Sequence, residues 1–198
     1  MAVDLPLPAH VAAGVRIAWR PVRPPYGPRQ ESAAGRRAAS AALAAAGAAA
    51  SVVTRHADGR PCFPPGFAGS ISHTDRLAVA VVFPGAVGVG VDIEDAVISP
   101  RVARFVLRER ERRTLLVPGA GFTSRELFAA KEAAFKALYG PETQGELLFW
   151  RVELSRSGDA LEASYRGVRV PVWVRSETDL SLAVALRTCP HGPAAMPF

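Results

Sequence analysis

Two carboxylates stand two residues apart in the segment 88–94, which reads Gly-Val-Gly-Val-Asp-Ile-Glu. Valine and isoleucine alternate with the other residues there, and this pattern is typical of a buried strand. On a strand, residues i and i+2 point to the same face, so Asp92 and Glu94 would lie side by side. Neighbouring carboxylates in apolar surroundings repel each other, and a hard divalent cation would relieve that repulsion. An edge strand with a polar outer face is the alternative interpretation.

A second candidate group lies on the segment 124–138, which is predicted to be a helix. Phe128, Glu132 and Lys136 are spaced i, i+4 and i+8, so they form one stripe along that helix. Glu132 could add a third carboxylate to the pair on the strand, and Lys136 could add a cation one turn away. An ordinary Glu–Lys pair on a solvated helix face is the alternative. The only two lysines of the chain, Lys131 and Lys136, both lie in this helix, where a compact ammonium suits a specific site.

Several side chains upstream could donate hydrogen bonds to a phosphate. Ser72 and His73 end the sequence Ser-Ile-Ser-His on a short expected strand. Arg36 and Arg37 lie on the first expected helix, and Arg60 lies in a Gly-Arg-Pro turn. A lone histidine is more often structural, and arginine is abundant throughout the chain, so none of these residues is informative by itself.

Four segments occur in the order and with the spacing found in one enzyme family. Residues 88–94 resemble its G-[IV]-D-[IVL]-E strand, and residues 128–137 (FAAKEAAFKA) resemble its [WF]-x-x-K-E-[SA]-x-x-K-A helix. Residues 70–73 resemble its S-[IL]-S-H segment, and residues 59–64 (GRPCFP) resemble its G-R-P-x-[WF]-P turn. Over about residues 31–150 the chain therefore resembles the 4'-phosphopantetheinyl transferases of the Sfp type. Phenylalanine at the start of the helix motif favours the enterobactin-synthetase-associated branch.

The resemblance implies a metal site and catalytic residues. Asp92, Glu94 and Glu132 match the family's metal-binding carboxylates, which imply Mg²⁺, with Mn²⁺ as an alternative. Lys136 matches the lysine that contacts the pyrophosphate region of coenzyme A. We therefore expect Glu132, Lys136 and Asp92 to be the catalytic residues.

The resemblance also implies a site for the coenzyme A phosphates. Arg36, Arg60 and His73 match basic positions that hold these phosphates, and Ser72 lies beside them. Lys136 is expected to contribute to the same binding. One departure from the family pattern is Ser40, which stands where a second basic residue would be expected on the first helix.

The implied activity transfers the 4'-phosphopantetheine group of coenzyme A to a serine of an apo acyl or peptidyl carrier protein. The products are the holo-carrier protein and adenosine 3',5'-bisphosphate. Carrier proteins of this class are typically acidic around that serine, so an acidic carrier is the expected partner. We expect it to dock on Arg101, Arg104, Arg108 and the segment 118–124. Nonribosomal peptide, siderophore, polyketide and fatty-acid synthesis all remain open as its pathway.

Two other functions are open. The chain could be a non-catalytic or degenerate relative that binds coenzyme A, or a metal-dependent nuclease. A nuclease site commonly carries an E-x-K spacing on a strand, whereas Glu132 and Lys136 are four residues apart in a helical pattern. A further family glutamate also has two candidates, because Glu109 and Glu111 fit it in neighbouring registers.

Charge and composition limit the partners. The formal net charge is +6 and the sequence pI is about 10.1, which favours an anionic partner, although arginine-rich composition alone raises the pI. We expect neither nucleic acid nor membrane as a partner, since no stretch approaches the roughly 18 apolar residues of a membrane span.

Cys62 and Cys189 show no metal or redox spacing, and no signal peptide is evident. A cytoplasmic protein, and by resemblance a monomer, is expected.

The order of elements predicts an α+β protein with antiparallel sheets. Helices are expected at 31–49, 101–116 and 124–138, a loop at 59–69, and strands near 15–19, 52–54, 71–73, 77–83, 87–93, 150–154, 161–165, 168–174 and 182–186. Each half has one strong helix and several strands, which predicts two similar halves, 1–98 and 99–198. The resemblance implies that a pseudo-two-fold axis relates them and that the active site lies in the cleft between them.

Overall fold

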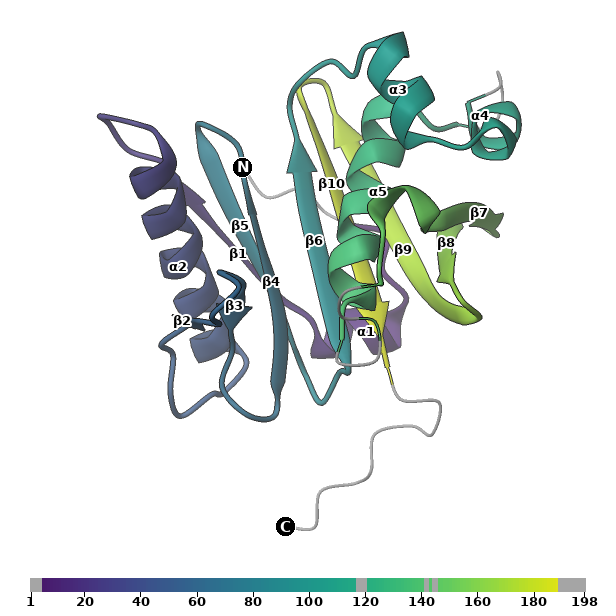
Figure 1. The fold of residues 1–198 in the computed structure, drawn as a ribbon. Helices are drawn as coiled ribbons and strands as arrows, with labels where there is room; N and C mark the ends of the chain where they lie inside the picture. Colours follow the sequence, from purple (N-terminus) through teal and green to yellow (C-terminus); the bar gives the residue numbers. More distant parts are fainter. Residues whose placement is uncertain (1–4, 117–120, 141–142, 144–145, 189–198) are drawn as a thin grey trace.

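The computed structural model of the chain describes residues 5–116, 121–140, 143 and 146–188. Within them the protein is α+β with antiparallel sheets and a helix packed on each half, so the predicted fold class is confirmed (Figure 1). Cys189 and residues 118–120 of the segment 118–124 lie outside the described residues.

Five α-helices and ten strands make up the described chain. The helices are α1 (Ala9–Gly14), α2 (Pro28–Ala45), α3 (Pro100–Val106), α4 (Glu109–Leu115) and α5 (Ser124–Leu138), with a 3₁₀ helix at Phe149–Arg151. The strands are β1 (Arg16–Pro21), β2 (Thr54–Arg55), β3 (Pro61–Cys62), β4 (Phe67–His73), β5 (Leu77–Pro84), β6 (Gly88–Glu94), β7 (Glu153–Ser157), β8 (Ala160–Tyr165), β9 (Val168–Glu177) and β10 (Leu180–Arg187). They form sheets of order β1-β5-β4 and β6-β10-β9-β8-β7, and the small hairpin β2-β3.

Helix α2 covers one face of the first sheet through alanine. Its buried side chains include Ala38 and Ala42, which pack with Ala80 and Val82 of β5. Alanine favours the helix and its small side chain allows a close approach to the sheet. The helix starts at a proline and ends before Gly47, whose φ of +78° is the left-handed conformation that stops a helix. It therefore ends earlier than the expected residue 49.

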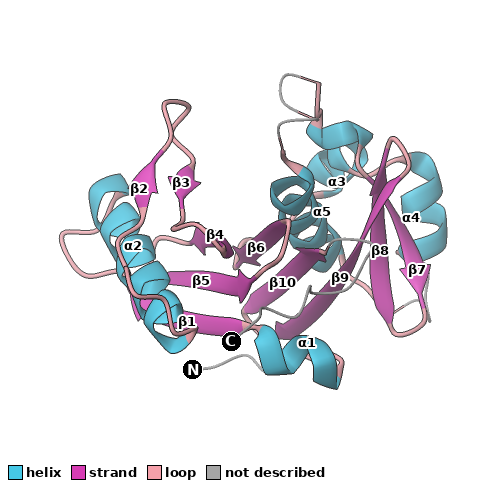
Figure 2. Cartoon of the chain, turned by 90° about the horizontal axis from the view of Figure 1, so that it is seen from below, coloured by secondary structure: helices cyan, strands magenta, loops and turns pink. Residues whose placement is uncertain are grey.

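The opposite face of the first sheet packs on the second sheet. Val79 and Val81 of β5 are fully buried in one cluster with Val89, Val91 and Ile93 of β6. The edge strands β4 and β6 lie side by side where the two sheets meet (Figures 1 and 2). The carboxylate strand therefore lies at the junction between the halves.

Helix α5 covers the second sheet on its other face. It lies against β6, β10 and β9, and its buried residues include Ala129, Ala133 and Ala137. Strand β6 is hydrogen-bonded to β10, so it belongs to the second sheet although the expected boundary at residue 98 groups it with the first half. The division into 1–98 and 99–198 stays a prediction.

The single charged helix expected at 101–116 is wrong, because the chain forms two short helices there. Leu107 and Arg108 are extended between α3 and α4. Glu111 Oε2 accepts a hydrogen bond from the backbone N–H of Arg108, which starts α4 as a separate helix. The expected loop at 59–69 also contains β3 and the start of β4, and α1 was not anticipated.

No helix among the described residues has both the length and the apolar character needed to cross a membrane.

Candidate active site

Two glycines let α5 approach the strand that carries the carboxylates. Gly88, Gly90, Asp92 and Glu94 share one face of β6 because they are spaced by two. A Cβ atom at Gly90 would overlap the carbonyl oxygen of Ala133, and one at Gly88 would overlap that of Ala137. The glycines thus seat the helix on the strand, and the two carboxylates follow at the same face beside it.

Gly90→Ala is expected to destabilise the protein and to reduce its activity. The new methyl group meets a backbone carbonyl of α5, which cannot rotate away as a side chain can, so the cost is about 1–3 kcal/mol or more. Denaturant unfolding and the rate of transfer check this. Gly158→Ala in the β7–β8 turn, where a Cβ meets no atom, should be strained but remain active. An active Gly90→Ala protein of normal stability would contradict this role.

The side chain of Asp92 on β6 contacts residues of both β4 and α5. Its Oδ1 accepts hydrogen bonds from Ser72 Oγ and from Lys136 Nζ, both at 2.8 Å. Lys136 Nζ also donates to the carbonyl of Val91 at 2.9 Å, and the Ile93 N–H donates to Ser72 Oγ at 3.3 Å. Asp92 is only 7% exposed. The polar face of β6 is therefore covered, unlike the solvated edge strand considered as an alternative.

Lys136 keeps one donor for a ligand. An ammonium group has three N–H donors, and two of them are used on β6. Its side chain remains 29% exposed, so the third donor is accessible to a ligand. Because Lys136 bonds β6, it is not part of a solvated Glu–Lys pair with Glu132.

The three predicted metal ligands influence one another electrostatically. Burial raises the pKa of Glu132; Lys136 opposes this shift, and Asp92 and Glu94 add to it. Burial also raises the pKa of Glu94. The hydrogen bond that Glu94 accepts from the backbone N–H of Ala96 partly offsets this effect by lowering the pKa. Repelling carboxylate oxygens of this kind suit a hard divalent cation. Within the described residues, however, no three acidic, histidine or cysteine side chains converge closely enough to hold a metal as they stand.

The Ser-Ile-Ser-His segment of β4 places polar side chains on both faces of its strand. Neighbouring residues of a strand point to opposite faces, so Ser72 points to β6 while His73 points to α2. His73 Nδ1 lies 3.5 Å from Glu31 Oε2 on α2. Strand β4 therefore connects the carboxylates on β6 to a second group of polar residues against α2.

That second group lines a pocket of about 270 Å³ between α2, β4 and the β2–β3 hairpin. Arg36 and His73, both predicted to bind coenzyme A phosphates, line it together. Arg55 was not predicted, yet it lines the same pocket and donates to Ser32 Oγ at 2.6 Å. Arg36 donates to the same oxygen at 2.7 Å, so one serine holds two guanidinium groups. The only sequence signal for Arg55 was its place directly after the strand expected near 52–54.

Arg60 lies outside the lining of this pocket, although its neighbours Gly59 and Pro61 belong to it. Its Nε is 2.8 Å from Asp58 Oδ2, and its guanidinium stacks on the ring of Tyr139. The backbone N–H and then the side chain of Arg60 lower the pKa of Asp58.

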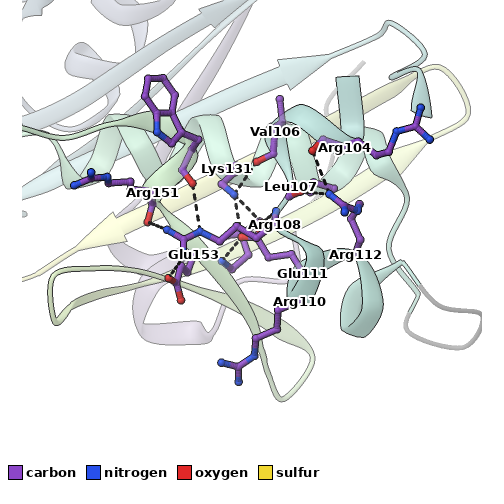
Figure 3. Close-up of polar contacts among 12 residues, drawn as sticks. Arg104, Val106, Leu107, Arg108, Arg110, Glu111, Arg112, Lys131, Arg151 and Glu153 are labelled. Carbon is purple, nitrogen blue, oxygen red and sulfur yellow. Dashed lines mark hydrogen bonds and ion pairs between the residues drawn. The ribbon is translucent and has the colours of Figure 1, made fainter. Parts of the chain in front are cut away.

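The buried residues Lys131 and Glu111 form an ion pair beside the site. Lys131 Nζ lies 2.8 Å from Glu111 Oε2, and the two side chains are 0% and 2% exposed (Figure 3). Glu111 also accepts from the backbone of Arg108 and of Leu154, so it joins α4, α5 and β7. Glu109 instead makes an exposed pair with Arg113. Of the two candidate glutamates, Glu111 is the one built into the fold.

Comparison with protein families gives two matches along the chain. The 4'-phosphopantetheinyl transferase N-terminal domain matches residues 28–83, and the 4'-phosphopantetheinyl transferase superfamily matches residues 88–185. The two matches follow each other and together cover most of the chain, so the chain belongs to the 4'-phosphopantetheinyl transferase superfamily. Members of this family are transferases that use coenzyme A and act on carrier proteins. A comparison with curated proteins gave no match.

Proposed function

We propose that this protein transfers the 4'-phosphopantetheine group of coenzyme A to a serine of an apo acyl or peptidyl carrier protein. The observation that carries the proposal is the cluster of Asp92, Ser72 and Lys136 at the junction of the two sheets, beside Glu132. Family membership supports the reaction class. The Sfp type and the enterobactin-like branch stay predictions, as do the carrier and its pathway.

The residues around Asp92 suit a phosphoryl-type transfer, which needs positioning and charge neutralisation more than covalent help from the protein. The serine hydroxyl of the carrier attacks the phosphorus next to the pantetheine arm, and adenosine 3',5'-bisphosphate leaves with the oxygen that bridged the two phosphates. Glu132 accepts the proton of the hydroxyl, because burial raises the pKa of its carboxylate and makes it a better base. The remaining N–H of Lys136 donates to the pyrophosphate and stabilises the charge that develops.

Asp92, Glu94 and Glu132 would hold the Mg²⁺ ion. Their donor atoms are oxygens, and the mutual repulsion of the carboxylates would favour a divalent cation between them. When bound, such an ion neutralises charge on the pyrophosphate during the transfer. Asp92 Oδ1 already accepts two hydrogen bonds, so its Oδ2, for which the described residues provide no donor, is the oxygen that would face the ion.

The pocket against α2 is the proposed site for the 3'-phosphate of the adenosine part of coenzyme A. Arg36, Arg55 and His73 supply the positive charge or donors, and guanidinium groups bind phosphate oxygens in pairs. Strand β4 carries both His73 and Ser72. One coenzyme lying along β4 would therefore place the 3'-phosphate of its adenosine at α2 and its pyrophosphate near Asp92 and Lys136.

The carrier protein is proposed to dock on α3 and the 3₁₀ helix. Arg101 and Arg104 are exposed on α3, and the apolar side chains of Phe105 and Trp150 beside them are 78% and 52% exposed. Phe105, Trp150 and Arg104 line one open pocket. Arg108, which was also expected here, is instead engaged by Glu153 and by backbone carbonyls (Figure 3). The surface combines positive charge with apolar area, which suits an acidic helix with an apolar stripe.

Arg101→Glu with Arg104→Glu should raise KM for an acidic carrier roughly tenfold at low salt while the affinity for coenzyme A stays unchanged. Opposite charges on two proteins speed their encounter. Reversing the charge on α3 should therefore weaken binding of the carrier but not binding of coenzyme A at the distant pocket on α2. Steady-state kinetics with varied carrier, and calorimetric titration with coenzyme A, measure the two effects. Arg175→Glu, at an exposed position of β9 on the sheet face turned away from α5, serves as the charge-reversal control. Unchanged carrier kinetics in the double variant would remove α3 from the docking surface.

Release of adenosine 3',5'-bisphosphate tests the proposed reaction. Chromatography of a mixture of the protein, coenzyme A, Mg²⁺ and an apo carrier should show the bisphosphate only when all are present. Cleavage of nucleic acid with no release from coenzyme A would support the nuclease instead. Binding of coenzyme A without any release would support a non-catalytic relative.

A further inference from the structure

The hairpin β2–β3 contacts the C-terminal end of α5 through a cation–π pair of Arg60 and Tyr139. Arg60 Cζ lies 3.9 Å from the centroid of the Tyr139 ring. Arg60 comes from the hairpin that walls the pocket at α2, and Tyr139 is the residue that caps α5. Figure 2 shows the hairpin and α5 on either side of β4 and β6. The pair therefore joins the phosphate pocket to the helix that carries Glu132 and Lys136.

The stack leaves the ligand-binding edge of Arg60 open. Asp58 accepts from Arg60 Nε at 2.8 Å and from its backbone N–H at 3.1 Å. The guanidinium carbon lies over the ring of Tyr139, and the Arg60 side chain remains 44% exposed. No described residue accepts a hydrogen bond from Nη1 or Nη2. A planar guanidinium held in this way can present two parallel N–H donors to one phosphate.

Tyr139 is itself held firmly. Its backbone N–H donates to the carbonyl of Phe135 at 3.2 Å. Thr143 Oγ1 donates to the carbonyl of Leu138 at 3.0 Å and accepts from the N–H of Gly140 at 2.8 Å, so it fixes the chain on both sides of Tyr139. The ring is half-buried against the core of the second half. The Tyr139 ring, which lies under Arg60, therefore has a fixed position three residues after Lys136.

We propose that Tyr139 is a positioning residue for coenzyme A, which acts by holding the Arg60 guanidinium in the orientation that binds a phosphate. This inference rests on the proposed function. Without the ring, Arg60 would swing on its exposed hairpin and would have to be ordered when the coenzyme binds. The loss would appear in the affinity for coenzyme A, while the chemistry at Glu132 and Lys136 would proceed as before.

Two substitutions of Tyr139 separate the stack from the packing. Tyr139→Phe keeps the aromatic face, whereas Tyr139→Leu keeps apolar volume without it. Calorimetric titration of the full chain with coenzyme A should give a Kd within about twofold of the parent for Tyr139→Phe, and roughly three- to tenfold higher for Tyr139→Leu. With a carrier protein, KM for coenzyme A should follow the Kd while kcat changes by less than about twofold. Thermal unfolding of both variants shows whether Leu keeps the fold.

The coupling with Arg60 gives the decisive outcome. Because Tyr139 acts through Arg60, adding Tyr139→Leu to Arg60→Ala should weaken binding no further. An equal Kd for Tyr139→Leu and the parent, or additive losses in the double variant, would overturn the positioning role and leave the proposed function intact. A parent protein that does not bind coenzyme A at all would overturn both.

Discussion

Glu132→Gln is expected to lower the rate of phosphopantetheine transfer on the order of 10²- to 10⁴-fold. The substitution removes the base that would accept the serine proton and one of three oxygen ligands, yet it changes the volume of the side chain very little. The affinity for coenzyme A should change much less, because the pocket at α2 is untouched. Single-turnover kinetics with saturating coenzyme A and carrier measure the effect on the chemical step.

The loss in Glu132→Gln should not come from unfolding. Burial raises the pKa of Glu132 in the folded protein, so at neutral pH the ionised form costs more there than in the unfolded chain. Replacing it with a neutral amide should leave the free energy of unfolding in the metal-free protein unchanged or slightly higher. Glu109→Gln, on the exposed side of α4, is the matched control and should remain active. A fully active Glu132→Gln protein would exclude Glu132 from the mechanism.

Lys131→Met is expected to destabilise the protein by about 3–5 kcal/mol, because it leaves Glu111 as a buried carboxylate without its cation. For a chain of this size the melting temperature should fall on the order of 10 °C. Adding Glu111→Gln to Lys131→Met should recover part of the loss, since the unpaired charge is then removed. Thermal and denaturant unfolding measure both variants.

An exposed ion pair provides the comparison. Arg113 and Glu109 are i, i+4 neighbours on α4 with side chains 77% and 66% exposed, so Arg113→Ala should cost only about 0.3–0.5 kcal/mol. A similarly small loss in Lys131→Met would show that the buried pair does not hold α4, α5 and β7 together.

Local signals were enough to predict the elements that carry the site. The helix at 124–138 was predicted with its true bounds, because an alanine-rich stripe ends there before a glycine. In the structure Thr123 caps the helix, and its side chain accepts a hydrogen bond from the backbone N–H of Glu126. The strand with Asp92 and Glu94 was also anticipated, since its alternation of apolar and other residues is local.

Features that depend on tertiary contacts could not be predicted in the same way. The break between α3 and α4 follows from Glu111, whose carboxylate is fixed by Lys131 and by β7. Arg55 reaches the pocket only because the hairpin folds over α2, and Tyr139 meets Arg60 across the two halves. The motif residues indicated the chemistry of the site, while the contacts that orient them come from segments far apart in the sequence.

Phosphopantetheine transfer is tested most directly by the intact mass of an apo carrier protein after incubation with this protein, coenzyme A and Mg²⁺. We expect a gain equal to one phosphopantetheine group on the serine, which is lost with a metal chelator and with Glu132→Gln. Coenzyme A must be shown to bind in the same preparation. No mass gain on any of several unrelated acidic carriers, despite bound coenzyme A, would contradict transfer and indicate a protein that binds the coenzyme without using it.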